Sequence, residues 1–293
     1  MTAPALSRNV NKNTEGDSVV KSNIIEACVM ENELHFGKEN TSLERNRNDC
    51  ESISSQESID SKRARRGSLL KDIIDKSNAI CISLDLEHGG DKCGVTQLSA
   101  VLFKLGGLEE SSFSKDVVIR EVFNEYVRPP PSAIWNPICI EKTGLHPDNS
   151  NILKADPIDL VWKRFVNYLK KYINGEKRGI LIAWNGSSCD LEWLYRYTQA
   201  PGSTLSFPPR VKYYMDPYRE ISRTPGCKIH ASKSKLQSYN LSSVYNFVIG
   251  KELSGAHCSL VDAKAQASVV ISGMFRSIWR KKTLSRMYQI FSH

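Results

Sequence analysis

The stretch "AICISLDLEHG" at residues 79–89 has the apolar density of a strand buried in a sheet. Near its end it carries Asp85 and Glu87, and residues two apart on a strand project to the same face. Two carboxylates on one face repel each other unless a cation neutralises them, and a hard divalent ion such as Mg²⁺ or Mn²⁺ is the usual partner. Taken alone, such a pair is more often a solvated strand edge than a metal site.

Four further segments have the apolar content of strands, and turn residues separate them. They cover residues 95–105, 118–129, 178–185 and 210–216. The first three strands follow one another with short connections, which favours an antiparallel meander.

Four segments carry apolar residues at helical spacing: 156–175, 189–199, 235–250 and 259–282. The element order is therefore β-β-β-α-β-α-β-α-α. This order predicts an α/β fold with a five-stranded mixed sheet flanked by helices, in one domain of about 210 residues.

A third acidic residue, Asp190, stands at the end of "LIAWNGSSCD", residues 181–190. The pair Asn185-Gly186 is a turn signal, so Asp190 opens the helix that follows the fourth strand. An acid in this position is often only a helix cap. The same position is where ligand sites open at the ends of strands in α/β sheets, and both interpretations stay open.

The stretch "GAHCSLVDAKAQASVV" at residues 255–270 combines His257 with Asp262. On one continuous helix these two side chains would point about 140° apart. An N-cap at Ser259 places His257 in the entry loop and Asp262 in the first turn, where both could face one site. A nucleophile formed by Cys258 and His257 is disfavoured, because adjacent side chains point apart and no third orienting group is evident.

The charge is unevenly distributed along the 293 residues, which carry a net charge of +8. Residues 1–60 contain six Lys/Arg and eleven Asp/Glu, a net charge of −5, which leaves +13 on residues 61–293. A basic body favours a polyanionic partner such as nucleic acid, and the alternative is a solvated basic surface.

The composition predicts where the folded domain begins and ends. Residues 1–72 are rich in Ser, Asn, Glu and Asp, which predicts a disordered tail. Within this tail, the basic cluster at 62–66 could be a nuclear-import signal or a phosphate-binding arm, or only a basic linker. We expect the folded domain over 73–280 and a basic tail over 281–293.

Other features bear on the compartment. No apolar run reaches the length of a membrane span, and the N-terminal residues lack the apolar region of a secretory signal. The eight cysteines form no CxxC pair, so we expect reduced thiols in an intracellular protein without a membrane partner. The basic cluster favours the nucleus over the cytoplasm.

The motifs come in a defined order: DxE on the first strand, N-x4-D at a strand-to-helix turn, and H-x4-D at the final helix. This order resembles that of the DEDDh exonucleases, which include ribonuclease T and the proofreading subunits of bacterial polymerases. The run "YNLSSVYNFVIGKELSGAHCSLVDA" and the N-G-x-x-x-D spacing are most similar to the animal three-prime repair exonucleases. The resemblance covers residues 78 to about 275.

The resemblance implies a ribonuclease-H-like fold with a site for two Mg²⁺ ions, which Mn²⁺ could replace. It implies that Asp85 bridges both ions, that Glu87 and Asp262 help to hold the first, and that Asp190 holds the second mainly through water. It further implies that His257 is the general base that takes a proton from the attacking water, a task suited to a side chain that titrates near neutral pH.

Two departures from the family pattern concern substrate binding. The family usually has Thr and then Gly after the DxE glutamate, whereas His88, Gly89 and Gly90 follow here. The family's backbone contacts the terminal nucleotide at this point, so we expect His88, Gly89 and Asn185 to bind substrate. Trp184 replaces a frequent family His, and we expect it in the core rather than stacked on a base.

These features predict a metal-dependent 3′-to-5′ exonuclease that releases nucleoside monophosphates from the 3′ end of DNA or RNA. One alternative is a catalytically weak or inactive nucleic-acid-binding or interaction module of the same fold, which could be linked to a mobile element. A second alternative is an exonuclease-like domain that serves a mobile element or a larger assembly, with the tail recruiting a partner. By the same resemblance the protein could be a homodimer. Lys212, Lys228, Lys233 and Lys235 either border the cleft and contact phosphates or form a solvated loop.

Overall fold

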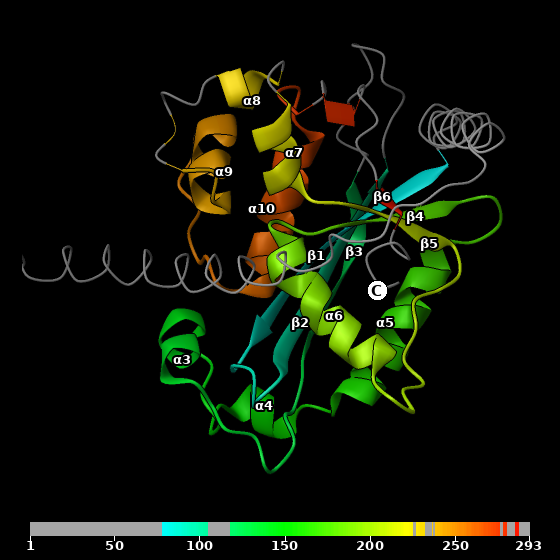
Figure 1. Cartoon of the computed structure of the whole chain (residues 1–293), viewed down its shortest axis with the longest axis vertical. Coiled ribbons are helices and arrows are strands. Elements are labelled where there is room, and N and C mark those ends of the chain that lie inside the picture. The colour runs from blue at the N-terminus through cyan, green and yellow to red at the C-terminus, as the bar shows by residue number, and fades with distance from the viewer. Residues whose placement is uncertain are drawn as a thin grey trace, which may run out of the picture. The chain divides into compact units, whose positions relative to one another are not determined.

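A computed structural model describes residues 78–104, 118–224, 227–231, 236, 238–275, 278–279 and 285–286 (Figure 1). The predicted disordered tail over 1–72 and its basic cluster at 62–66 lie outside the described residues, so the nuclear location stays a prediction.

One mixed sheet organises the described part, with the strand order β3-β2-β1-β4-β5-β6. The strands are β1 (Ala79–His88), β2 (Val95–Lys104), β3 (Val118–Tyr126), β4 (Arg178–Ile182), β5 (Val211–Met215) and β6 (Ser285–Arg286). Strands β1, β2 and β3 form the predicted antiparallel meander, and β4 and β5 continue the sheet in parallel with β1. The two-residue β6 pairs antiparallel with β5 and was not anticipated, because the sequence there reads as a basic tail.

Helices cover both faces of this sheet (Figure 1). The face with α5 (Ile158–Tyr172) and α6 (Asp190–Gln199) carries one apolar cluster. The opposite face carries a second cluster with α7 (Pro217–Arg223), α9 (Leu241–Ile249) and α10 (Ser259–Ile271). The predicted α/β, ribonuclease-H-like fold is therefore confirmed: the five predicted strands form the mixed sheet, and β6 adds a short sixth strand at its edge.

The remaining helical segments are short: α3 (Pro137–Thr143), α4 (Ser150–Lys154), the 3₁₀ turn η2 (Gly186–Ser188) and α8 (Lys228–Ala231). Two predicted helix boundaries were wrong. The helix predicted over 235–250 begins only at Leu241, where the Asn240 side chain accepts a hydrogen bond from the Ser243 N–H and caps the helix. The helix predicted over 259–282 ends at Ile271, and the chain turns at Ser272.

Strand β1 lies between β2 and β4, and the alternation of its side chains divides the two cores. Ile80, Ile82 and Leu84 pack into the cluster with α5 and α6. Ala79 and Cys81 face the other way, into the cluster with α10. Asp85 and Glu87 are also odd-numbered residues of this strand, so the alternation of side chains places both carboxylates on the α10 side of the sheet.

A buried polar network attaches α10 to the sheet. The Gln266 side chain, 1% exposed, donates hydrogen bonds to the Ser83 hydroxyl at 2.7 Å and the Ile182 carbonyl at 2.8 Å. The Ser83 hydroxyl in turn donates to the Ala263 carbonyl at 2.7 Å. Because each partner is satisfied, the network fixes the position of α10 against β1 and β4.

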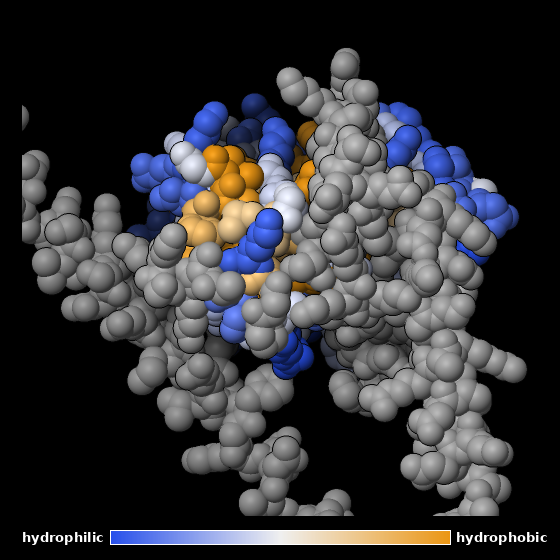
Figure 2. Space-filling view, turned by 90° about the horizontal axis from the view of Figure 1, so that it is seen from above, coloured by the Kyte–Doolittle hydropathy of each residue, from blue (hydrophilic) through white to orange (hydrophobic). Residues whose placement is uncertain are grey.

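No described helix is both long and apolar enough to cross a bilayer. Among the described residues visible in Figure 2, hydrophilic side chains lie at the left and the right, and apolar side chains lie between them.

Replacing Gln266 with leucine should destabilise the protein by about 1–3 kcal/mol, because the buried Ile182 carbonyl loses its donor. Ser268→Ala on the exposed face of the same helix is the matched control, expected to change stability by less than about 0.5 kcal/mol. Urea denaturation measures both, and equal midpoints for Gln266→Leu and the wild type would contradict the role of the network.

Candidate metal centre

Three predicted carboxylates come together at the carboxyl end of β1. Oxygen atoms of Asp85, Glu87 and Asp262 all lie within 4.8 Å of one another. Glu87 is 8% exposed, while Asp85 and Asp262 are partly buried. Two of these side chains come from one strand and the third from the first turn of α10, so the site depends on how α10 docks on the sheet.

The fourth predicted carboxylate, Asp190, reaches the same strand end from the other face. It is the first residue of α6 and is 5% exposed. Its Oδ1 accepts a hydrogen bond from the backbone N–H of Leu86 at 2.9 Å. Leu86 lies between Asp85 and Glu87 in sequence, so this bond ties Asp190 to the strand that carries the other two.

The placement of His257 before α10 is as predicted, but the helix cap is not Ser259. Cys258 occupies the N-cap position, and Ser259 is the first helical residue. The Ser259 hydroxyl is buried and shares a 2.6 Å hydrogen bond with the Ser99 hydroxyl of β2. The expectation of a Ser259 cap was wrong because the sheet, rather than the helix terminus, provides the partner of this hydroxyl.

His257 contacts Asp262 through its backbone. The backbone N–H of His257 donates to Asp262 Oδ2 at 2.9 Å, and the His257 side chain is exposed. His257 has a φ of 66°, in the left-handed region that non-glycine residues seldom occupy. Local strain of this kind is kept where the surrounding structure requires it, often at functional sites.

Burial raises the pKa of all four carboxylates, and repulsion between acidic groups adds to the shift at Asp85, Glu87 and Asp190. Burial, reinforced by Asp262 and Asp190, raises the pKa of Glu87 to about 8. Burial also raises the pKa of Asp190 to about 7, although the Leu86 N–H opposes the shift. The pKa of Asp85 is raised well above its usual value by burial and by the charges of Asp190 and Glu87. Burial raises the pKa of Asp262, with its hydrogen bond from His257 acting in the opposite direction.

The arrangement fits a hard divalent cation. Within the described part of the chain, no lysine or arginine forms an ion pair with any of the four carboxylates. Asp262 Oδ1 is buried and has no hydrogen-bond partner there. A buried carboxylate oxygen left without a donor is costly unless a cation meets it, and carboxylate oxygens are the ligands that a hard divalent cation prefers.

Asp216 supports the turn that presents Asp190, and sequence analysis missed it. This 3%-exposed residue caps α7, where its Oδ1 accepts from the Tyr218 N–H at 3.1 Å. The same carboxylate accepts from the Asn185 N–H at 2.9 Å and from the Ser187 hydroxyl at 3.1 Å. The signal was available, because Asp followed by Pro217 is a helix-start pattern.

The predicted substrate-binding residues are close to the carboxylates in sequence, since His88 and Gly89 follow Glu87 and Asn185 precedes Asp190. His88 ends β1, its Nδ1 accepts from the Gly90 N–H at 3.1 Å, and its ring lies 5.2 Å from that of Trp193. Gly89 donates to the Gly94 carbonyl and accepts from the Asn136 N–H, so both its backbone groups are used within the protein. Their roles and that of Asn185, with its φ of 51°, stay predictions.

Trp184 lies in the core, as expected. It is 9% exposed, and its indole N–H donates to the Tyr239 carbonyl at 3.1 Å.

The stability of the metal-free protein should fall as the pH rises from about 5 to 8. Its four carboxylates have raised pKa values when folded, about 7 for Asp190 and about 8 for Glu87, against ordinary values of 3.8 and 4.5. The folded state therefore binds more protons than the unfolded state in this range, and it loses stability as these protons leave.

Thermal unfolding in EDTA across this range measures the effect. The double variant Glu87→Gln and Asp190→Asn should flatten the decline, whereas the exposed control Asp148→Asn should keep it. Saturating Mg²⁺ or Mn²⁺ should restore the melting temperature at pH 8. A melting temperature of the wild type in EDTA that stays level or rises from pH 5 to 8 would contradict the assignment.

No family model matches this sequence, and no curated protein matches it. Among solved structures, the chain is similar to DEDDh-family 3′ exonucleases. One is the nuclease domain of 3′hExo bound to rAMP, with a TM-score of 0.49 and 18% identity over 66% of this chain and 89% of that one. Another is cell-death related nuclease 4, with a TM-score of 0.49 and 15% identity over 67% of this chain and 64% of that one.

Proposed function

We propose that this protein is a metal-dependent 3′-to-5′ exonuclease that hydrolyses phosphodiester bonds at nucleic acid 3′ ends. The observation that carries the proposal is the convergence of Asp85, Glu87, Asp190 and Asp262 at one strand end, without a lysine or arginine paired to them in the described structure. Such a charge cluster is stable at neutral pH only with bound cations or protons.

The four carboxylates would divide the work of holding two divalent ions. Asp85, Glu87 and Asp262 would hold the first, since their oxygen atoms lie within 4.8 Å of one another. Asp190 would share the second with Asp85, because its Oδ1 is held at β1 by the Leu86 N–H. When bound, Mg²⁺ or Mn²⁺ would supply positive charge to the phosphodiester oxygens as the bond breaks.

His257 would act as the general base. It would accept a proton from the water that attacks phosphorus, while the bond between phosphorus and the 3′ oxygen breaks and a nucleoside 5′-monophosphate leaves. Its exposed side chain leaves the imidazole able to meet this water, and the hydrogen bond from its backbone to Asp262 fixes the loop beside the carboxylates. The terminal nucleotide would lie against His88, Gly89 and Asn185.

An end-labelled degradation assay tests this function. The substrates are 5′-labelled single-stranded DNA and RNA, incubated with Mg²⁺, with Mn²⁺ or with EDTA. The protein should shorten them from the 3′ end in the presence of either metal, and EDTA should abolish the reaction. Asp190→Ala should lower the rate by about 100-fold or more, because one side of the site loses its ligand.

Asp148→Asn is the control for a carboxylate removed from an exposed turn, and it should leave the rate unchanged. Intact substrate under every metal, together with retained binding in a gel shift, would reject the enzyme and leave the alternative of a nucleic-acid-binding module.

His257 allows function to be separated from folding. Because its φ is 66°, His257→Gly should leave the melting temperature unchanged or raise it. The same substitution should lower the exonuclease rate by about 100-fold to 10,000-fold, since the base is lost. His257→Asn, whose side chain also tolerates a positive φ, should be equally slow. A His257→Gly protein with full activity would show that another group takes the proton.

A further inference from the structure

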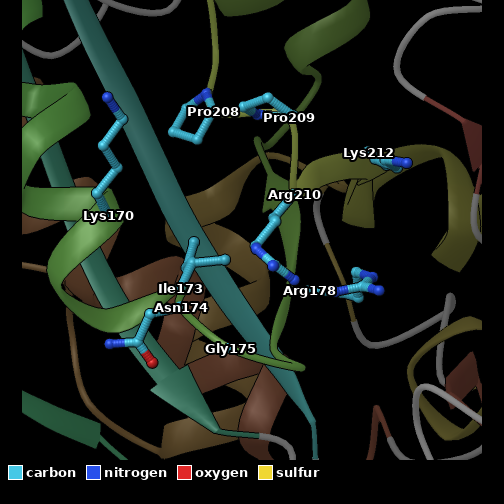
Figure 3. Close-up of a pocket in the computed structure, with 9 residues that line it drawn as sticks. All are labelled: Lys170, Ile173, Asn174, Gly175, Arg178, Pro208, Pro209, Arg210 and Lys212. Atoms are coloured by element: carbon cyan, nitrogen blue, oxygen red, sulfur yellow. The ribbon is translucent and has the colours of Figure 1, made fainter.

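A basic groove lies away from the carboxylates. It has a volume of about 590 Å³ and is lined by the end of α5, the loop to β4 and the segment that enters β5 (Figure 3). Four of its lining residues are cationic: Lys170, Arg178, Arg210 and Lys212. No acidic residue lines it.

The groove lies toward the end of the sheet opposite to the candidate metal centre. Arg178 pairs with Ala79 at the start of β1, and β4 runs parallel to β1. Asp85 lies six residues further along the same strand, which corresponds to about 20 Å. The groove and the carboxylates are therefore distinct sites connected by the length of one central strand.

The position of Lys212 results from an irregularity in the sheet. Gly179 pairs with Val211, but the next residue, Ile180, pairs with Tyr213, so Lys212 is left without a partner across the ladder. Such a bulge redirects a side chain, and Lys212 is exposed whereas the rest of β5 is buried. Lys212 thus lies in strand β5 and lines the groove, whereas the sequence left open whether it borders the cleft or belongs to a solvated loop.

The charges of the groove lack the compensation found nearby. On the same helix as Lys170, Lys171 pairs with Glu121 and Arg164 pairs with Glu125 and Asp156. In contrast, none of the described carboxylates pairs with any of the four groove cations. Like charges gathered in a concave surface raise the local positive potential and attract a polyanion.

We propose that this basic groove binds backbone phosphates of the nucleic acid strand whose 3′ end occupies the carboxylate site. The inference rests on the proposed exonuclease function and adds a second binding region to it. A strand must span at least about 20 Å to reach both sites, which is about six stacked nucleotides at 3.4 Å each. The groove therefore acts only on strands of that length or longer.

Strand binding without cleavage tests the proposal. The full chain in EDTA is titrated against fluorescent single strands of about four and about 20 nucleotides, at several salt concentrations. The groove variant replaces Lys170, Arg178, Arg210 and Lys212 with glutamine. The matched control replaces four exposed cations elsewhere, Lys154, Lys163, Arg223 and Lys251, with glutamine, so both variants lose the same charge.

The groove variant should bind the long strand about ten-fold more weakly than the control. The slope of its log affinity against log salt should be shallower by roughly 0.7 for each phosphate that the groove no longer neutralises. The short strand should bind all three proteins alike. Arg178 also donates hydrogen bonds to the Glu176 and Lys177 carbonyls, so replacing it could disturb folding. A triple variant that replaces only Lys170, Arg210 and Lys212 keeps these bonds. It should still show most of the decrease in affinity for the long strand.

The remaining outcomes overturn the proposal. If the groove variant and the control variant bind the long strand with equal affinity, the proposal is wrong. This holds whether both affinities equal that of the wild type or both are lower. A peptide of residues 1–60, which has a net charge of −5, tests whether the groove binds an acidic peptide instead. If the groove substitutions weaken binding of this peptide but not of the long strand, the ligand of the groove is a peptide. Cleavage of the short strand with Mg²⁺ is measured separately, so a failed groove is distinguished from a failed exonuclease.

Discussion

Four carboxylates repel one another at the carboxyl end of β1, and the surrounding structure holds them together against that repulsion. Asp190 is held by the Leu86 N–H, and Asp262 by the His257 N–H. These hydrogen bonds stabilise the charged forms, but burial outweighs them and raises the pKa of both side chains. A protein gains nothing in stability from such a cluster by itself, which is the physical reason to assign it to cation binding.

The rest of the fold can be understood as support for this cluster. Gln266 and Ser83 fix α10 to β1, and α10 brings Asp262 to the two carboxylates of the strand. Asp216 caps α7 and also orders the turn that leads to Asp190. The negative cluster and the basic groove lie toward opposite ends of the sheet, which is a suitable division for a polyanion with one reacting end and a long backbone.

Strand alternation and turn residues are local signals, and they predicted the five main strands and the helices on the sheet. The shared site of the four carboxylates was implied only by the family resemblance. In the structure Asp85, Glu87 and Asp262 lie together, and Asp190 is bonded to the same strand. The sequence did not predict the Ser259 hydrogen bond to Ser99, the bulge at Lys212 or the pairing of Ser285 and Arg286 with β5. Each of these depends on a partner far away in the chain, which no local pattern of residues reveals.

A Mn²⁺ titration followed by electron paramagnetic resonance shows whether the four carboxylates form a divalent cation site. Free Mn²⁺ gives a strong signal that disappears on binding, so the titration counts bound ions without requiring turnover. We expect saturable binding of up to two ions, with the affinity strongly reduced in Asp85→Asn and unchanged in Asp148→Asn. A Mn²⁺ signal that the wild type and Asp85→Asn reduce equally would contradict this expectation.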